Sequence, residues 1–187
     1  LKARREIINE GHEEDKKELL IENFKKLDHK KIKLIWSNFY DSYFQALNIS
    51  QIERQTRLLL NKEKGETIAK FIEDREGGLL NLLIYTSDRP NVFSSVVSVL
   101  DSENVNVLDA KLFGTKDGFC IENITIADDS RENLLDETEK LREIEKKLKQ
   151  ILRIKDLKPS FVTKRLPIRL KSFSKKTTIE ITQDNEN

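Results

Sequence analysis

The chain has 187 residues, of which 37% are hydrophobic and 36% are charged, and its formal net charge at pH 7 is +1. This length holds one domain of about 100 to 150 residues with an appendage, and the composition predicts a buried core beneath charged helices. The balanced charge argues against nucleic acid and against a charged membrane surface as partners, and no apolar run reaches the roughly 20 residues that span a bilayer.

The two ends of the chain and its cysteine content indicate its context. The chain starts at Leu1 and contains no methionine, so we expect it to be a piece of a longer protein. No signal-peptide pattern opens it. Cys120 is the only cysteine, which rules out an internal disulfide and fits a reducing cytoplasm. Because Cys120 falls in an alternating segment, we expect a buried apolar thiol.

Residues 1–64 have the periodicity of helices. Helices are predicted over Glu13 to Leu27, Lys31 to Asn38 and Asp41 to Leu47. The last two carry an aromatic cluster, which we expect to form a helix-packing core because each ring buries a large apolar area. Ser50 followed by Glu53 is a capping-box pattern that predicts a further helix, which ends near Gly65.

The segment from Leu79 to Leu100 predicts a strand that passes into a helix through a polar loop. Its first half alternates with a period of two, and an extra strand over Thr67 to Glu73 is expected to pair with it. Pro90 predicts that the helix begins there, with Asp88 as its cap. The apolar stripe that follows then places this helix on a sheet.

Two antiparallel strands are predicted next, over Val105 to Phe113 and Phe119 to Ala127, and a turn containing Asp117 and Gly118 joins them. A second helix is expected to start at Asp128 to Ser130 and to run to Ile151, and a last strand is expected over Thr177 to Ile181. The order βαββαβ predicts an α+β fold with a ferredoxin-like antiparallel sheet, preceded by a small all-α segment.

Three blocks of residues carry a resemblance to a known family. They are Tyr85-Thr86-Ser87-Asp88-Arg89-Pro90-Asn91-Val92-Phe93, Asn106-Val107-Leu108-Asp109-Ala110-Lys111-Leu112-Phe113 and Thr115-Lys116-Asp117-Gly118. In this order they resemble the first ACT domain of the bifunctional uridylyltransferase/uridylyl-removing enzymes, which modify the PII nitrogen-signalling protein. Ile35-Trp36 and Tyr43-Phe44 resemble the helices that join the HD domain of this family to its ACT pair, and Lys164-Arg165-Leu166-Pro167 resembles a basic connection to the last strand.

The resemblance implies two domains in what would be a C-terminal fragment of such an enzyme. Residues 1–64 would be a helical connector, and residues 65–183 would be an ACT domain that includes the basic connection 155–176. We expect this basic run to be a solvated connection and not a nucleic-acid interface. The implied function is regulatory: the domain would sense or transmit glutamine status, and so nitrogen status, to catalytic domains outside this chain.

Further expectations concern chemistry and partners. We find no paired metal-binding carboxylates, glycine-rich phosphate loop or nucleophile with a base, so we expect no catalytic residue, cofactor or metal in this chain. The resemblance implies a parent nucleotidyltransferase with phosphohydrolase activity that uses Mg and UTP in the cytoplasm. The implied partners are glutamine or another small amino acid, the other domains of the parent, a second ACT domain, and PII through the parent.

The effector site implied by the resemblance lies at the strand-to-helix loop. The implied residues are Asp88, Arg89, Asn91, Val92, Phe93, Asn106 and Asp109. Free amides at the start of a helix favour an anion such as an amino-acid carboxylate. Asn91 stands where many ACT loops have glycine. In the structural interpretation of the same loop, Asp88 is only a helix cap and Phe93 is a core residue.

Two other functions stay open from the sequence. The first is a domain-docking or dimerisation module without an effector, because the predicted helices cover only one sheet face. Leu79, Leu83 and Tyr85 would then leave apolar groups on the other face for a partner. The second is an ACT segment that regulates an enzyme of amino-acid metabolism.

Overall fold

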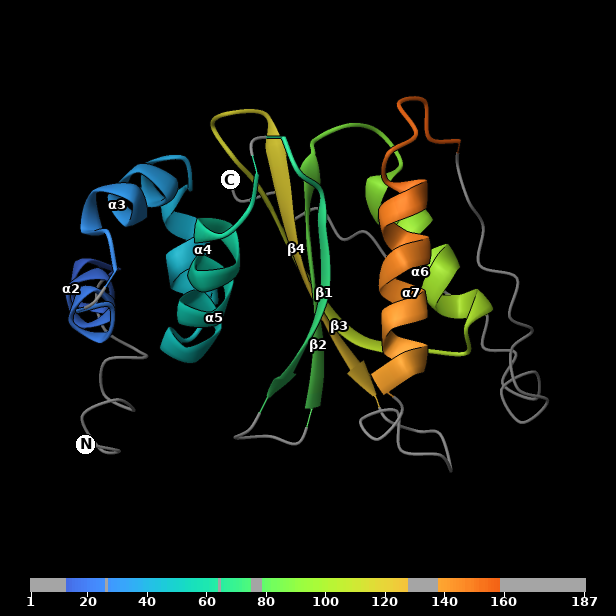
Figure 1. Cartoon of the computed structure of the whole chain (residues 1–187), viewed down its shortest axis with the longest axis horizontal. Coiled ribbons are helices and arrows are strands. Elements are labelled where there is room, and N and C mark those ends of the chain that lie inside the picture. The colour runs from blue at the N-terminus through green and yellow to red at the C-terminus, as the bar shows by residue number, and fades with distance from the viewer. Residues whose placement is uncertain (1–12, 26, 64, 75–78, 128–137, 159–187) are drawn as a thin grey trace, which may run out of the picture.

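The structure has a helical segment within residues 13–60, a four-stranded sheet and two further helices on the far side of the sheet (Figure 1). This computed structural model describes residues 13–25, 27–63, 65–74, 79–127 and 138–158. The helices are α2 (Glu13–Asn23), α3 (His29–Ser37), α4 (Asp41–Ala46), α5 (Ile49–Leu60), α6 (Val92–Ser102) and α7 (Thr138–Ile151). The strands are β1 (Ile68–Asp74), β2 (Leu79–Ser87), β3 (Asn106–Gly114) and β4 (Phe119–Ala127). Within these residues, no helix has the length and apolar character needed to cross a membrane.

The four strands are antiparallel and lie in the order β1-β2-β4-β3. In chain order, β2, α6, β3, β4 and α7 form the βαββα portion of the predicted fold, and the predicted extra strand is β1, which pairs with β2. The α+β, ferredoxin-like fold class preceded by helices is therefore confirmed. The predicted last strand over Thr177 to Ile181 lies outside the described residues, and β1 occupies the sheet edge next to β2.

Helices α6 and α7 cover one face of the sheet (Figure 1). The period of two in β2 and β4 places alternate apolar residues on this face. The helical period in α6 and α7 places a stripe of apolar residues opposite them. The fully buried members of this cluster are Ala69, Leu82, Ile84, Val96, Leu100, Ile124, Ile144 and Leu148. This packing holds the start of α6 against the ends of the strands.

The helical segment covers the opposite face of the sheet. Leu83 and Tyr85 of β2 and Ile121 of β4 share one apolar cluster with the aromatic residues of α3 and α4. Those aromatic residues and their near neighbours are Trp36, Phe39, Tyr43 and Phe44. The expectation that helices cover only one face was wrong, because the aromatic cluster packs against the sheet as well as between helices.

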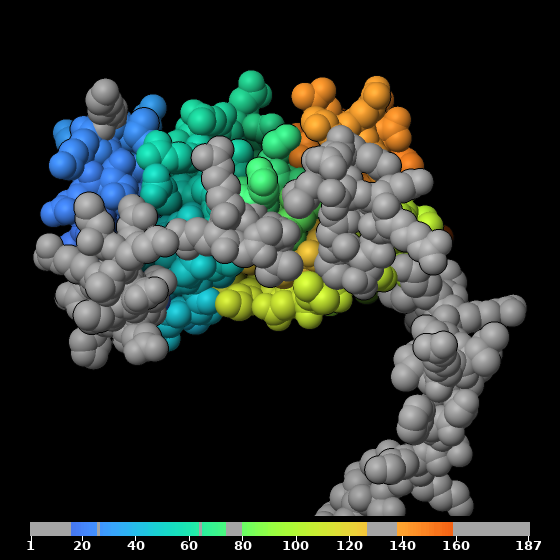
Figure 2. Space-filling model, turned by 90° about the horizontal axis from the view of Figure 1, so that it is seen from below, coloured from blue at the N-terminus to red at the C-terminus, as the bar shows by residue number. Residues whose placement is uncertain are grey.

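Polar contacts also join the helical segment to the sheet. Gln55 of α5 accepts a hydrogen bond from the Tyr43 hydroxyl at 2.8 Å and donates one to Asn123 of β4 at 3.0 Å. The backbone N–H of Lys116 donates to the carbonyl of Asn38 at 2.8 Å. Figure 2 shows the helical segment, in blue and teal, packed beside the green strands. Buried polar groups need such partners, so these contacts help to fix how the layers pack.

The cap of α5 differs from the predicted one. Asn48 is the N-cap, and its side chain accepts a hydrogen bond from the Gln51 backbone N–H at 2.8 Å while the Gln51 side chain accepts one from the Asn48 N–H at 3.1 Å. The Ser50 and Glu53 capping box was therefore wrong, because the helix starts two residues earlier and both residues lie inside it.

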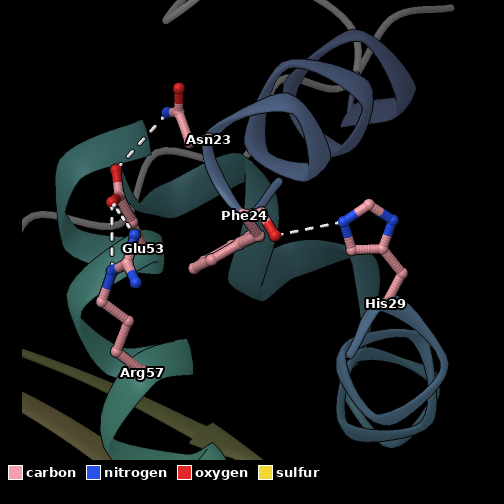
Figure 3. A network of polar contacts seen from close by, with 5 residues as sticks. All are labelled: Asn23, Phe24, His29, Glu53 and Arg57. Atoms are coloured by element: carbon pink, nitrogen blue, oxygen red, sulfur yellow. Dashed lines mark hydrogen bonds and ion pairs between the residues drawn. The ribbon is translucent and has the colours of Figure 1, made fainter. Parts of the chain in front are cut away.

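Glu53 instead connects two helices, as Figure 3 shows. Its carboxylate accepts hydrogen bonds from Asn23 at the end of α2, at 3.4 Å, and from Arg57 one turn later in α5, at 2.8 Å. In the same region Nε2 of His29 lies 3.1 Å from the carbonyl oxygen of Phe24. The residue at the start of α3 thus contacts the end of α2, and the histidine has a structural contact.

Candidate functional site

The loop between β2 and α6 turns at Asn91. Its φ is 68°, in the left-handed region that asparagine tolerates better than most residues, and α6 begins at the next residue, Val92. The predicted start at Pro90 with Asp88 as cap was wrong, since Asn91 is the N-cap and makes no side-chain cap. The Asn91 Nδ2 instead donates to the carbonyl of Leu157 at 2.8 Å.

Arg89 holds the same loop against the chain that follows α7. Its Nη2 donates to the carbonyl oxygens of Leu152 at 2.5 Å and Ile154 at 3.2 Å, and its Nη1 donates to that of Ser87 at 2.8 Å. A cation is favourable beside the free carbonyls at the end of a helix. Arg89 therefore positions the loop, while its buried Nε has no hydrogen-bond partner in the described part of the chain.

A pocket of about 440 Å³ lies between this loop, the start of α6 and the adjoining ends of β3 and β4. Its lining residues are Asp88, Arg89, Asn91, Val92, Phe93, Ser94, Leu112, Phe113, Gly114, Cys120 and Glu122. The first five are residues of the predicted effector site, which the fold brings together. The other two predicted residues, Asn106 and Asp109, do not line the pocket, because it borders the opposite end of β3.

Phe93 is not a core residue. Its side chain is 37% exposed and lines the pocket, whereas its neighbour Val92 is buried. The buried residues of α6 are Val92, Ser95, Val96 and Leu100, at helical spacing from the observed start of the helix, and the partly buried Val99 packs against the same cluster. The alternative interpretation of Phe93 as a folding residue was therefore wrong, and the apolar stripe of α6 is narrower than the sequence predicts.

Glu122 is one of six lining residues that the sequence analysis did not assign to the site, and the only carboxylate among them. It is only 1% exposed, and it occupies an inward position of β4 between Cys120 and Ile124, two members of the apolar cluster beneath α6 and α7. The Glu122 Oε2 has no hydrogen-bond partner among the described residues. A charged residue at an apolar position of an alternating strand was the signal that could have identified it.

Burial controls the titration of both ionisable groups that β4 contributes to the pocket. Loss of solvent, and secondarily the negative charge of Asp88, raises the pKa of Glu122 to about 7. Loss of solvent also raises the pKa of the Cys120 thiol to about 12. Cys120 is therefore a buried, protonated thiol at neutral pH, as its place in the strand predicts.

The pocket offers groups of both polarities to a small molecule. Asp88 and Glu122 supply carboxylates, and the first turn of α6 supplies backbone amides that the Asn91 side chain does not cap. Arg89 also lines the pocket, and its Nε is a buried donor without a hydrogen-bond partner among the described residues. In the part of the chain that the structure describes, no three His, Cys, Asp or Glu residues are grouped closely enough to hold a metal ion.

Fold and pocket together define a class: a ferredoxin-like α+β domain preceded by helices, with a polar pocket where a strand passes into a helix. No family model matches the chain. It is similar to the bifunctional uridylyltransferase/uridylyl-removing enzyme of Idiomarina loihiensis, with 30% identity over 177 residues, which is 94% of this chain and 20% of that protein.

Two further relatives carry the same name. In Acinetobacter baumannii the identity is 28% over 168 residues, covering 88% of this chain and 18% of the relative. In Aliivibrio fischeri it is 24% over 147 residues, covering 78% of this chain and 16% of the relative. The chain is thus homologous to a segment of the bifunctional uridylyltransferase/uridylyl-removing enzymes, as the resemblance predicts, and spans about a fifth of the length of the curated relatives it matches.

Proposed function

We propose that the chain is a regulatory region of a uridylyltransferase/uridylyl-removing enzyme, in which an ACT domain preceded by a helical connector transmits glutamine status to catalytic domains elsewhere in the enzyme. Its similarity to about a fifth of such enzymes supports a regulatory part of them. In this proposal the pocket beside Asn91 is the effector site.

The observation that carries the proposal is the polarity of this pocket. A free amino acid such as glutamine has a carboxylate and an ammonium group a few bonds apart, and the pocket presents partners for both. The amides at the start of α6 and the Nε of Arg89 suit the carboxylate, and Glu122 and Asp88 suit the ammonium group. A volume of about 440 Å³ is sufficient for a small ligand of this kind.

The same proposal includes the context of the parent enzyme. The catalytic domains would use Mg and UTP, act on PII in the cytoplasm, and receive the effector signal through the helical segment. The packing of this segment on the sheet supports that route, because Gln55 bonds to Asn123 on the strand that also carries Glu122. The proposal also includes a second ACT domain in the parent as a neighbour.

Isothermal titration with L-glutamine tests the effector site, and Gly114 offers a blocking variant. A Cβ atom placed at Gly114 would lie 3.8 Å from Asp88 Oδ2, so Gly114→Val should fill pocket volume beside that carboxylate. We expect the unmodified chain to bind L-glutamine with one-to-one stoichiometry and Gly114→Val to bind it roughly tenfold more weakly or worse.

Leu108→Ala is the matched control, since Leu108 is exposed on the same strand and does not line the pocket. It should bind L-glutamine as the unmodified chain does. A folded chain that gives no heat with millimolar L-glutamine, or equal binding by Gly114→Val, would contradict glutamine sensing at this pocket.

The alternative function, a domain-docking or dimerisation module, depended on a free apolar sheet face. The sheet face that carries Leu83 and Tyr85 is buried beneath the helical segment of this chain, so these residues offer no free surface to a partner. The structure gives no observation that favours the second alternative, an amino-acid metabolic enzyme, over the homologous uridylyltransferases.

A further inference from the structure

We propose that the pocket binds the ammonium group of its ligand through the carboxylate of Glu122, with Asp88 as the second carboxylate. This inference deepens the proposed effector site and rests on that proposal for the occupancy of the pocket. It names a recognition residue that lies on a strand outside the predicted loop, and it restricts the ligand to molecules that carry a compact positive group.

Glu122 lies where the sheet and two helices enclose its carboxylate. It lies on β4, a central strand, opposite Ile84 of β2 on one side and Leu112 of β3 on the other. Helices α6 and α7 cover the same face of the sheet. The side chain is 1% exposed, lines the pocket, and has one carboxylate oxygen without a hydrogen-bond partner in the described structure.

A buried carboxylate without a partner is costly to ionise, so a positive partner would stabilise its charged form. Removing an ionised carboxylate from water is costly unless it is paired and hydrogen-bonded, and the negative charge of Asp88 adds repulsion. The nearest guanidinium on the loop, that of Arg89, directs both Nη atoms to backbone and hydroxyl oxygens. It therefore does not bond to Glu122, and a cationic ligand would supply the missing partner.

The geometry favours an ammonium group over a metal ion. Within the described ranges, no three potential ligand side chains group closely enough for a metal, whereas an ammonium group has three N–H donors that two carboxylates can share. The lining is also partly apolar, with Leu112, Phe113 and Phe93 beside the carboxylates. A small amine or amino acid with a short apolar or amide portion matches this lining.

Calorimetric titration of the full chain and of Glu122→Gln with four probes tests the inference. Three probes carry an ammonium group: L-glutamine, L-arginine and 1,4-diaminobutane. The fourth, N-acetyl-L-glutamine, keeps the carboxylate and amide but lacks the positive charge. We expect at least one ammonium probe to bind the unmodified chain, Glu122→Gln to weaken that binding roughly tenfold or more, and N-acetyl-L-glutamine to bind weakly to both.

Glu143→Gln is the matched control, because Glu143 is an exposed glutamate on α7 that does not line the pocket; it should leave binding unchanged. Circular dichroism confirms that each variant is folded before titration. If L-glutamine binds Glu122→Gln as well as the unmodified chain, glutamine sensing survives and the ammonium site is overturned. If 1,4-diaminobutane or L-arginine binds through Glu122 while L-glutamine does not, the ammonium site survives and glutamine sensing fails. Binding of none of the ammonium probes overturns the inference.

Discussion

Asn91 and Glu122 show how single residues set the shape and the charge of the pocket. Asn91 adopts a backbone conformation that favours glycine, with φ of 68°, and its side chain ties the loop to Leu157. Glu122 places a carboxylate in an apolar layer. Neither choice is the best one for folding alone, and both lie at the same pocket.

Replacement of Asn91 by alanine should destabilise the fold more than replacement by glycine. Both variants lose the hydrogen bond to Leu157, but alanine adds the steric cost of a left-handed conformation, roughly 1 to 2 kcal/mol. Urea unfolding followed by circular dichroism measures both variants. Equal free energies of unfolding for Asn91→Ala and Asn91→Gly would show that the left-handed turn carries no strain.

Glu122→Gln should make stability less sensitive to pH. The folded state raises the pKa of Glu122 from 4.5 to about 7, so between these values the folded chain binds more protons than the unfolded chain. The contribution of Glu122 to the free energy of unfolding therefore falls as the pH rises through this window and stays low above it. The glutamine variant lacks this loss.

We expect Glu122→Gln to gain on the order of 2 to 3 kcal/mol relative to the unmodified chain between pH 4 and pH 8. Urea unfolding at several pH values measures this difference, and the exposed Glu143→Gln serves as the control. A pH profile of the unfolding free energy that Glu122→Gln leaves unchanged would show that the carboxyl group titrates normally in the folded chain.

At the scale of the elements, the ends of the helices depend on contacts that sequence patterns describe only in part. Two of the helix starts predicted from capping patterns lie at other residues: α5 starts after Asn48, and α6 starts after Asn91. Several polar residues near each start have side chains suited to capping. The residue that takes the N-cap position is set by where tertiary packing ends the preceding loop, and at α6 this residue, Asn91, makes no side-chain cap.

The cap of α5 gives a direct comparison. Asn48→Ala removes one of the two hydrogen bonds of the capping box, the one that the Asn48 side chain accepts from the Gln51 backbone N–H. The bond from the Asn48 backbone N–H to the Gln51 side chain can still form. The substitution should therefore cost about 1 kcal/mol. Ser50→Ala, inside the first turn, should cost much less. Thermal unfolding compares the two variants, and a larger loss for Ser50→Ala would place the cap at Ser50.

At the scale of the whole molecule, the sheet is the middle layer between two groups of helices (Figure 1). One apolar cluster joins it to α6 and α7, and a second joins it to the helical segment. Because strand side chains alternate between the two faces, β2 and β4 contribute to both clusters. A change at the pocket can therefore reach the helical segment through a strand that both layers share.

Leu83→Ala tests whether the helical segment and the sheet unfold together. Leu83 is fully buried between them, so its truncation should cost about 2 to 5 kcal/mol. Trp36, the only tryptophan, lies in the same cluster. Its fluorescence should report the same lowered unfolding temperature as far-ultraviolet circular dichroism.

The exposed Leu108→Ala provides the comparison for that experiment and should leave the unfolding temperature nearly unchanged. Separate transitions by fluorescence and circular dichroism in the unmodified chain would show that the helical segment and the sheet are independent folding units. A single transition that Leu83→Ala shifts in both signals would show that they fold cooperatively.

The sequence by itself determined the order of the described elements and the fold class, because periodicity and turn residues are local properties. The strand at Leu79, the hairpin at Asp117 and the extra strand at Thr67 all lie close to their predicted places. It also indicated the loop from Asp88 to Phe93 as one wall of the pocket. Only the tertiary structure decided which layers cover the sheet and which residues complete the pocket. Glu122 and Asp88 line the same pocket because strand pairing brings β4 beside β2. Such pairing depends on contacts between distant segments that no local pattern records.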